Sequence, residues 1–477
     1  MKKLLPLLFV LVLGLFFRTY QISERFLYAH DNDLASWIVK DIIVDRHLRL
    51  VGQETSAQGI FVGPLFYYAL IPFYLLTRMD PIGTLGFSVV VAGLALTSIY
   101  FVVKKLYGAR PALFAGLIYG ASQGINLTER EVVPTTPVML WTIWFFYAIN
   151  LVWQGKKSGL LIAAVLFSLV WHINLALILL TPLVLINLFR FKIKDFFLPI
   201  AIFLILSSPL FVFEVRHNFL QTKSLTASLS GLGGGHGQIT DKVFHVVQYA
   251  SKNINNLFWQ RPGSISIYLL PAIFLGLIFY LSFKKLVPGY TLFLIISWLV
   301  LFVIFFALHP INLSEYYLNG MNIIWIMTAA LFLANQKKVV SLTIISLFFF
   351  HNLYLLYAFP VNASGYIQKK AIVQYIAADA AKHNFPCAAV SYMTDVGYNF
   401  GYRYFFWLKK VKMAPVNSLA PVYTIVFPHP RANRLDETFG ALGIVLPDYQ
   451  RYNSDGIAVS CSGGDSNLTD SMFGFTK

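Results

Sequence analysis

Long apolar runs, separated by short polar segments, dominate the first 360 residues. A helix that crosses a bilayer core needs about 20 apolar residues, and about 17 at minimum unless it is buried in protein. The runs that we interpret as membrane-spanning helices are 4–17, 84–103, 111–126, 133–153, 158–172, 174–189, 196–213, 265–283, 288–308, 319–334 and 339–358. Several are short, which suggests helices that pack inside a bundle or border a cavity. The pattern therefore predicts a polytopic α-helical bundle of about 11 spans.

One apolar segment does not fit this series. Residues 64–77 are apolar but only about 14 residues long, too few for a lipid-facing crossing. If this segment crossed fully, every basic loop after it would move to the opposite side of the membrane. We therefore interpret it as a re-entrant or short helix that enters the membrane only partly.

The pattern changes after residue 360, where no long apolar run follows. An amphipathic helix is predicted over 366–384, and a second helical stretch over 398–410. Short strands are predicted over 388–393 and 422–427, with Pro, Gly and Asn residues between the elements. The chain thus divides into a transmembrane module and a small soluble α/β domain, with the bounds 1–360 and 361–477.

Basic residues give this bundle a predicted orientation. They cluster in every second loop, as Lys104-Lys105 with Arg110, Lys156-Lys157, Arg190 with Lys192 and Lys194, Lys284-Lys285, and Lys337-Lys338. Because Lys and Arg are enriched in cytoplasmic loops, these turns and the N-terminus are predicted to be cytoplasmic. The first helix is expected to be retained, since Arg18-Thr19-Tyr20 follows it in place of a small-residue cleavage site. The segments left outside are 18–63, 127–132, 214–264, 309–318 and 361–477.

Composition supports the membrane interpretation. The 477 residues are 57% hydrophobic and only 12% charged, and their mean hydropathy is +0.66. Soluble proteins are about 45–50% apolar and about 25% charged, so a disordered chain is excluded and a soluble multidomain enzyme is disfavoured. The net charge of +16 is explained by the cytoplasmic loops, and we expect no nucleic-acid partner.

The two cysteines, Cys387 and Cys461, both lie in the small domain. They are too few for a disulfide scaffold or a cysteine-ligated metal site. A bond between them would require an oxidising compartment, which the predicted exterior location provides. Their spacing is equally compatible with two unrelated thiols.

Candidate chemistry begins in the first exterior loop, at His30-Asp31-Asn32-Asp33. A surface helix with the period of an amphipathic element is predicted to follow. Two carboxylates at its start, Asp31 and Asp33, could hold a divalent cation, or one could act as a general base on a hydroxyl group. Alternatively, an aspartate here caps the helix N-terminus.

Further polar residues are predicted to face the same side as Asp31. Charged groups near membrane depth are costly and are therefore functional candidates. The candidates for substrate binding are Tyr67, Glu129, Arg130, Glu131, His309, Glu315, Tyr316, Tyr317 and, by charge and side only, Arg216. Acids, an arginine and tyrosines at one membrane face fit a site for an anionic lipid-linked substrate. No Rossmann or P-loop pattern indicates a nucleotide.

The order of these motifs resembles the GT-C glycosyltransferases, and most of all glycosyltransferase family 39, which includes protein O-mannosyltransferases and the lipid A aminoarabinose transferase. The resemblance covers about residues 1–360. It rests on the acidic loop, then Gly63 to Tyr68, then Thr128 to Pro134, and last the start of a helix at Glu315-Tyr316-Tyr317. The sequence departs from the family in having Asn32 where many members have Glu. Pro64 matches one proline of a commoner Lys-Pro-Pro, and the lysine is absent.

The resemblance implies transfer of a sugar from a polyprenyl-phosphate donor to a lipid, glycan or protein acceptor, on the exterior face and with inversion. It implies that Asp31 is the base and that Arg130 and Tyr316 contact the donor phosphate. Two other functions stay open. A lipid-linked-glycan transporter or flippase would place acids in mid-span, and a polysaccharide polymerase or ligase would have an arginine-rich exterior loop. The spans carry almost no acids, and 214–264 holds only two arginines.

Overall fold

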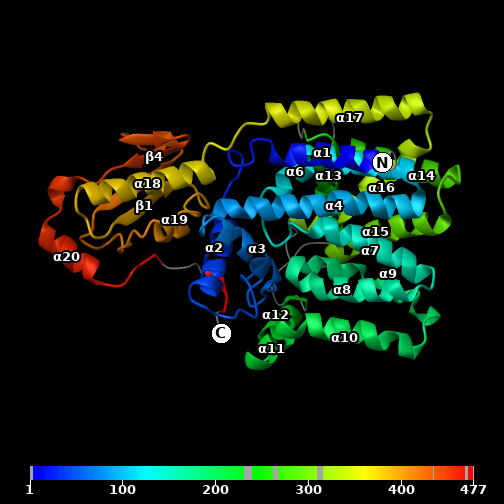
Figure 1. Cartoon of the computed structure of the whole chain (residues 1–477), viewed down its shortest axis with the longest axis horizontal. Coiled ribbons are helices and arrows are strands. Elements are labelled where there is room, and N and C mark those ends of the chain that lie inside the picture. The colour runs from blue at the N-terminus through cyan, green and yellow to red at the C-terminus, as the bar shows by residue number, and fades with distance from the viewer. Residues whose placement is uncertain are drawn as a thin grey trace.

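A computed structural model describes residues 4–229, 239–260, 267–308, 315–432, 434–467 and 471–475. Figure 1 shows a bundle of long helices with a small sheet-containing domain beside one of its ends. The main helices of the bundle are α1 (Leu5–Thr19), α4 (Thr84–Tyr107), α5 (Ala109–Ala121), α7 (Val138–Trp153), α8 (Lys157–Ile173), α10 (Phe197–Leu206), α14 (Leu269–Phe283), α15 (Gly289–Leu308), α16 (Asn322–Ala334) and α17 (Lys338–Ala358).

Four helical segments of the described residues are long and apolar enough to cross a membrane: Pro81–Tyr107, Gly289–Leu308, Tyr316–Ala334 and Lys338–Ala358. A fifth span results if Ile193–Leu206 and Ser208–Arg216, which meet at a bend of 57°, are counted together. Other predicted spans correspond to apolar helices of 10–17 residues. The helical bundle is confirmed, while the number of 11 spans stays a prediction.

Two predicted spans are broken into shorter pieces. The run 111–126 forms α5 and then α6 (Gln123–Glu129), because the Ser122 hydroxyl accepts the Ile125 N–H and starts a new helix. The run 174–189 forms the 3₁₀ helix η2 (Leu175–Leu180) and α9 (Thr181–Leu185), after the Asn174 side chain accepts the Ala176 N–H. Each break therefore comes from a single polar capping residue within a run that is apolar overall.

The basic turns share one end of the bundle. Arg110 in the first turn of α5 donates to the carbonyl of Gln336 in the α16–α17 turn, at 2.7 Å. Lys157 pairs with Asp195 at 2.7 Å. These contacts join turns that are far apart in sequence, as the alternating pattern predicts. The compartment that this end faces stays a prediction.

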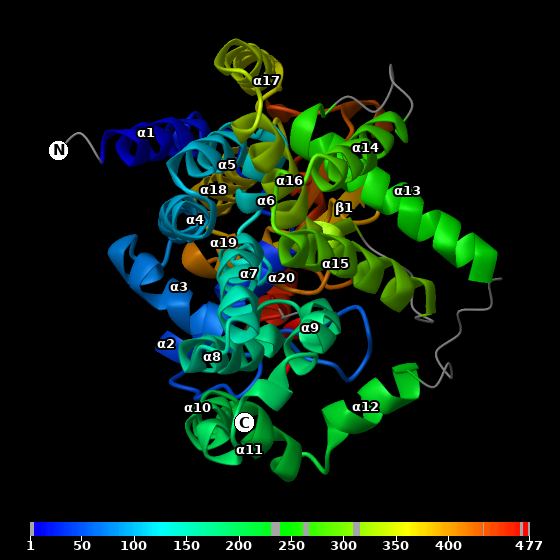
Figure 2. The ribbon, with the colours of Figure 1, turned by 90° about the vertical axis from the view of Figure 1, so that its right-hand side faces the viewer.

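The opposite end carries short surface elements. They are α2 (His30–Ile43), α3 (Leu65–Leu76), α11 (Ser208–Arg216), α12 (Leu220–Leu229) and η5 (Glu315–Met321), whereas the 20-residue α13 (Ile239–Phe258) packs against η5 and α15. The segment predicted to enter the membrane only partly is α3, a helix of 12 residues that packs against α2. Figure 2 looks along many of the bundle helices and shows α7, α8 and α9 next to one another.

The small domain contains the predicted sheet. Its four strands, in the order β1-β2-β4-β3, are β1 (Ala389–Thr394), β2 (Val422–Phe427), β4 (Leu442–Val445) and β3 (Glu437–Phe439). β1 and β2 are parallel, and the other pairs are antiparallel. The helix α18 (Tyr366–Lys382) lies along the sheet, and α19 (Arg403–Leu408) contacts α2. α19 is shorter than the predicted 398–410, because Gly401 has a φ of +87° and Arg403 begins the helix.

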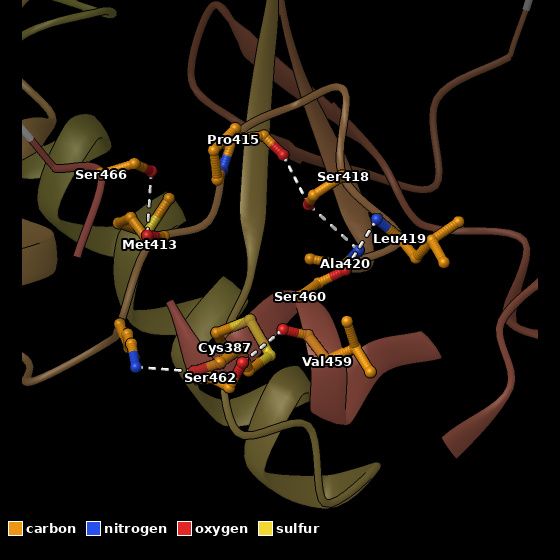
Figure 3. The surroundings of a disulfide bond; sticks show 12 residues. Cys387, Met413, Pro415, Ser418, Leu419, Ala420, Val459, Ser460, Ser462 and Ser466 are labelled. Carbon is orange, nitrogen blue, oxygen red and sulfur yellow. Dashed lines mark hydrogen bonds between the residues drawn. A yellow bond between two sulfur atoms is a disulfide. The ribbon is translucent and has the colours of Figure 1, made fainter. Parts of the chain in front are cut away.

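A disulfide joins Cys387 to Cys461, with their Cα atoms 5.5 Å apart. It connects the chain just before β1 to α20 (Ser454–Ser462), as Figure 3 shows. Around it, the Leu419 N–H donates to the Ser460 hydroxyl at 2.8 Å, and the Lys412 ammonium donates to the Cys461 carbonyl at 2.6 Å. Of the two interpretations that the sequence left open, the structure selects the paired cysteines.

Candidate active site

A large cavity of about 1550 Å³ lies between the surface elements and the bundle. Its polar part is lined by the start of α2, the loop 53–62, the segment between α6 and α7, and η5. Its apolar part extends between α8, α9 and α10, and its lining there includes Leu160, Phe167, Val170, Ile178, Ile200 and Phe203. One space thus combines a polar end with a long apolar groove, which is the shape that a lipid with a polar head requires.

Asp31 lies in the first turn of α2 and is exposed to this cavity. Its Oδ1 accepts a hydrogen bond of 2.9 Å from Nε2 of Gln53. Gln53 is itself held by Tyr67, whose hydroxyl donates to Gln53 Oε1 at 3.1 Å and accepts the Gln53 N–H at 3.2 Å. Tyr67 is fully buried, so it acts on the cavity only through Gln53.

Glu131 lines the same cavity and is close enough to Asp31 for their charges to interact. The protein around the cavity removes bulk water from the carboxyl group, and this desolvation, together with the smaller effect of the charge of Asp31, raises the pKa of Glu131 to about 6. Asn32, which directly follows Asp31, links the start of α2 to the segment that carries Glu131. Its Nδ2 donates to the carbonyls of Glu131 at 2.5 Å and Val132 at 3.1 Å.

Asp33 points away from the cavity, into the contact with the small domain. Its Oδ1 accepts the Tyr404 N–H at 3.2 Å and the Tyr28 hydroxyl at 3.4 Å. Burial raises the pKa of Asp33 to about 6, although the nearby Lys369 acts in the opposite direction. Asp31 and Asp33 therefore do not share one face and are not placed to hold a cation together. Within the described ranges, no group of three or more His, Cys, Asp or Glu residues could hold a metal ion.

Glu129 and Arg130 have different surroundings. Glu129 lines the cavity, but its carboxylate is paired with the buried Arg18 at 2.8 Å and accepts the Tyr119 hydroxyl at 2.5 Å. Arg130 is buried beside the end of α1, where its Nη2 donates to the carbonyls of Phe17 and Tyr20. It is not among the residues that line the cavity.

The tyrosines of η5 complete the polar end. Tyr316 and Tyr317 line the cavity, and the Tyr317 hydroxyl lies 3.5 Å from the Ser56 hydroxyl of the facing loop. Arg216 is exposed at the end of α11 and does not line the cavity. The candidate His309 and the side chain of Glu315 lie outside the described residues.

The described residues that line the cavity include carboxylates but no Lys, Arg or His. Three of the carboxylates have internal partners: Glu129 has Arg18, Glu54 accepts the Gly59 N–H, and Glu214 accepts the N–H groups of Gln221 and Thr222 at the start of α12. Asp31, which accepts one hydrogen bond from Gln53, and Glu131 are the two remaining carboxylates among the described lining residues, and they are the candidates for a chemical role.

Sequence reasoning missed two residues of this site. Gln53 stands in a polar stretch, Gly52 to Ser56, that could have drawn attention to it. Met472, which lines the cavity from a segment that follows α20, belongs to no pattern that would have revealed it.

The fold thus combines a bundle of apolar helices, an acidic surface loop beside a cavity with an apolar groove, and a small domain that contains a sheet. A scan of protein-family models and a search of curated proteins found no match. Among solved structures, the chain is similar to ArnT from Cupriavidus metallidurans bound to undecaprenyl phosphate, with a TM-score of 0.57 at 10% identity, over 94% of this chain and 99% of that one.

The archaeal oligosaccharyltransferase AglB from Archaeoglobus fulgidus, in complex with an inhibitory peptide and a dolichol-phosphate, matches with a TM-score of 0.47 at 11% identity, over 94% of this chain and 74% of AglB. The likeness to ArnT, an aminoarabinose transferase, confirms the resemblance to GT-C glycosyltransferases at the level of the fold.

Proposed function

We propose that this protein transfers a sugar from a polyprenyl-phosphate donor to an acceptor hydroxyl group at the non-cytoplasmic face of a membrane. The cavity carries the proposal, because it joins an apolar groove to a polar end that is lined by the carboxylates of Asp31 and Glu131. The groove suits a polyprenyl chain, and the polar end suits the phosphate and the sugar. The shared fold with ArnT, whose solved structure holds undecaprenyl phosphate, supports the same class of donor.

In this proposal Asp31 is the general base. The acceptor oxygen attacks the anomeric carbon as the bond from that carbon to the phosphate oxygen breaks. The hydroxyl proton passes to the Asp31 carboxylate, and the bonding electron pair leaves with polyprenyl phosphate. Attack opposite the leaving group inverts the anomeric centre. The side-chain amide of Gln53 donates from Nε2 to Asp31 Oδ1 and so holds Asp31 in place without occupying both of its oxygens.

Glu131, Tyr316 and Tyr317 serve substrate binding in this scheme. Near pH 6, Glu131 is partly protonated and donates a hydrogen bond to a phosphate or sugar oxygen. The tyrosine hydroxyls also donate to the phosphate, which as a leaving group needs charge stabilisation more than protonation. We do not include Arg130, because it contacts α1, nor Asp33, because it contacts the small domain.

Product analysis tests the proposal. Purified protein in nanodiscs is incubated with a panel of polyprenyl-phosphate sugars and with lipid, glycan and peptide acceptors, and the products are identified by mass spectrometry. We expect one donor to yield a glycosylated acceptor and free polyprenyl phosphate. Translocation of the donor across a proteoliposome membrane without any new glycosidic bond would instead favour the flippase.

A further inference from the structure

Five residues late in the range of the small domain, 471–475, lie against the membrane module and cover the loop that carries Gln53. We call residues 471–475, from η8 (Ser471–Phe473) to Phe475, the strap. Figure 1 shows the chain leaving α20 at the far side of the small domain and its C-terminal label beside α2 and α3. Of the strap, Met472 lines the cavity.

Backbone and charge contacts tie the strap to the loop on both sides of Gln53. The Glu54 N–H donates to the Met472 carbonyl at 2.9 Å. Arg49 Nη2 donates to the Phe473 carbonyl at 2.5 Å, and its guanidinium lies 4.2 Å from the centre of the Phe473 ring. Arg49 is buried and is itself fixed by Asp41 at 3.1 Å, so the strap is attached to a rigid anchor.

The last two strap residues fit closely against the same loop. Gly474 has a φ of +81°, and a Cβ atom built there would lie 2.3 Å from the Gly52 carbonyl oxygen. Only glycine therefore allows this approach. The Phe475 ring lies 5.3 Å from the ring of Phe61 and 4.6 Å from that of His217, and so bridges the loop to α11.

These contacts have a chemical consequence for Asp31. The strap holds the backbone of Gly52 and Glu54, and the residue between them, Gln53, donates the hydrogen bond to Asp31. We infer that the strap positions the catalytic carboxylate through Gln53 and contributes Met472 to the wall of the cavity. This inference rests on the proposed function, in which the donor lipid occupies the apolar groove and Asp31 is the general base.

Two strap variants and a matched control test this role. Gly474→Ala introduces the clash with Gly52, and Phe475→Ala removes the ring that bridges to α11. Gly440→Ala is the control, because Gly440 has a φ of +61° and a built Cβ would lie 2.4 Å from the Ala363 carbonyl oxygen, within the small domain. Phe475→Leu keeps apolar bulk and should therefore retain much of the function that Phe475→Ala loses.

The readouts are deuterium uptake of residues 49–62 and steady-state transfer. Both strap variants should raise the uptake and lower kcat by about 10- to 100-fold, as expected when a catalytic group is misplaced by about 1 Å. The KM for the donor should stay within about twofold, and the control should match wild type in both readouts. Unchanged uptake, or raised uptake with wild-type kcat, would overturn the positioning role. If wild-type protein transferred no sugar, the proposed function and this role would both fail, and the uptake would still show whether the strap holds the loop.

Discussion

Replacement of Asp31 by asparagine removes a base and leaves its surroundings almost unchanged. Asn has the same shape as Asp. Its Oδ1 can accept the same hydrogen bond from Gln53 Nε2, which measures 2.9 Å to Asp31 in the structure. The side chain is exposed to the cavity, so no buried partner loses its hydrogen bond. Stability should therefore change by no more than about 0.5 kcal/mol.

The effect on turnover should be large. Loss of a general base lowers a rate by about 100- to 10,000-fold, which is about 3–5 kcal/mol of additional barrier. The affinity for the donor should stay close to wild type, because its phosphate and lipid contact other residues. The assay measures kcat with saturating donor and acceptor, and donor affinity by a separate binding titration.

Asp33→Asn and Glu131→Gln are the matched controls for this assay. Asp33 faces the small domain, so Asp33→Asn should retain turnover within a few-fold. Glu131 is the other carboxylate that faces the cavity, and Glu131→Gln should raise the KM for the donor more than it lowers kcat. Normal turnover of Asp31→Asn together with collapse of Glu131→Gln would transfer the role of base to Glu131. Normal turnover in both would refute carboxylate base catalysis at this cavity.

Three further predictions concern stability. Because burial raises the pKa of Asp33 from 3.8 to about 6, the folded state should lose up to about 3 kcal/mol as the pH rises from about 4 through 6. Asp33→Asn should remove this loss, and an identical Tm profile in both proteins would contradict the prediction. Arg18→Met leaves Glu129 buried and unpaired, which should destabilise the protein by about 3–5 kcal/mol in thermal unfolding. Adding Glu129→Gln should recover part of this, and no recovery would argue against the ion pair. Replacing Cys387 and Cys461 by Ser opens a loop of 74 residues and should cost about 4 kcal/mol. Reductant should then lower the Tm of wild type but not of the variant, and equal behaviour would contradict the bond.

The sequence predicts most of the helices because their signal is local. Apolar length and the alternating basic turns place the start of α2, the α6–α7 segment and η5 at one end, and the structure brings Asp31, Glu131 and Tyr316 to one cavity there. Two strands of the small sheet also follow from local pattern, since β2 occupies the predicted 422–427 and β1 lies one residue beyond the predicted 388–393, whereas β3 and β4 were not predicted.

The direction of individual polar side chains depends on contacts far apart in sequence. Residues 31 and 33 are about 200° apart around a helix, so the sequence already separates them. Which of the two faces the cavity is decided by Tyr404, more than 370 residues later, because its N–H donates a hydrogen bond to Asp33. Arg130 is likewise drawn to the carbonyls at the end of α1, and no local pattern around it indicates this. Met472 reaches the cavity only because the small domain docks beside α2.

A single-turnover experiment tests the central claim most directly. Nanodiscs that hold the enzyme and one equivalent of the active polyprenyl-phosphate sugar are mixed with excess acceptor, and the product is analysed by mass spectrometry and NMR. We predict one polyprenyl phosphate released for each glycosylated acceptor, with inverted anomeric configuration, and at least about 100-fold slower formation by Asp31→Asn. Retained configuration, or equal rates in wild type and Asp31→Asn, would contradict direct displacement with Asp31 as the base.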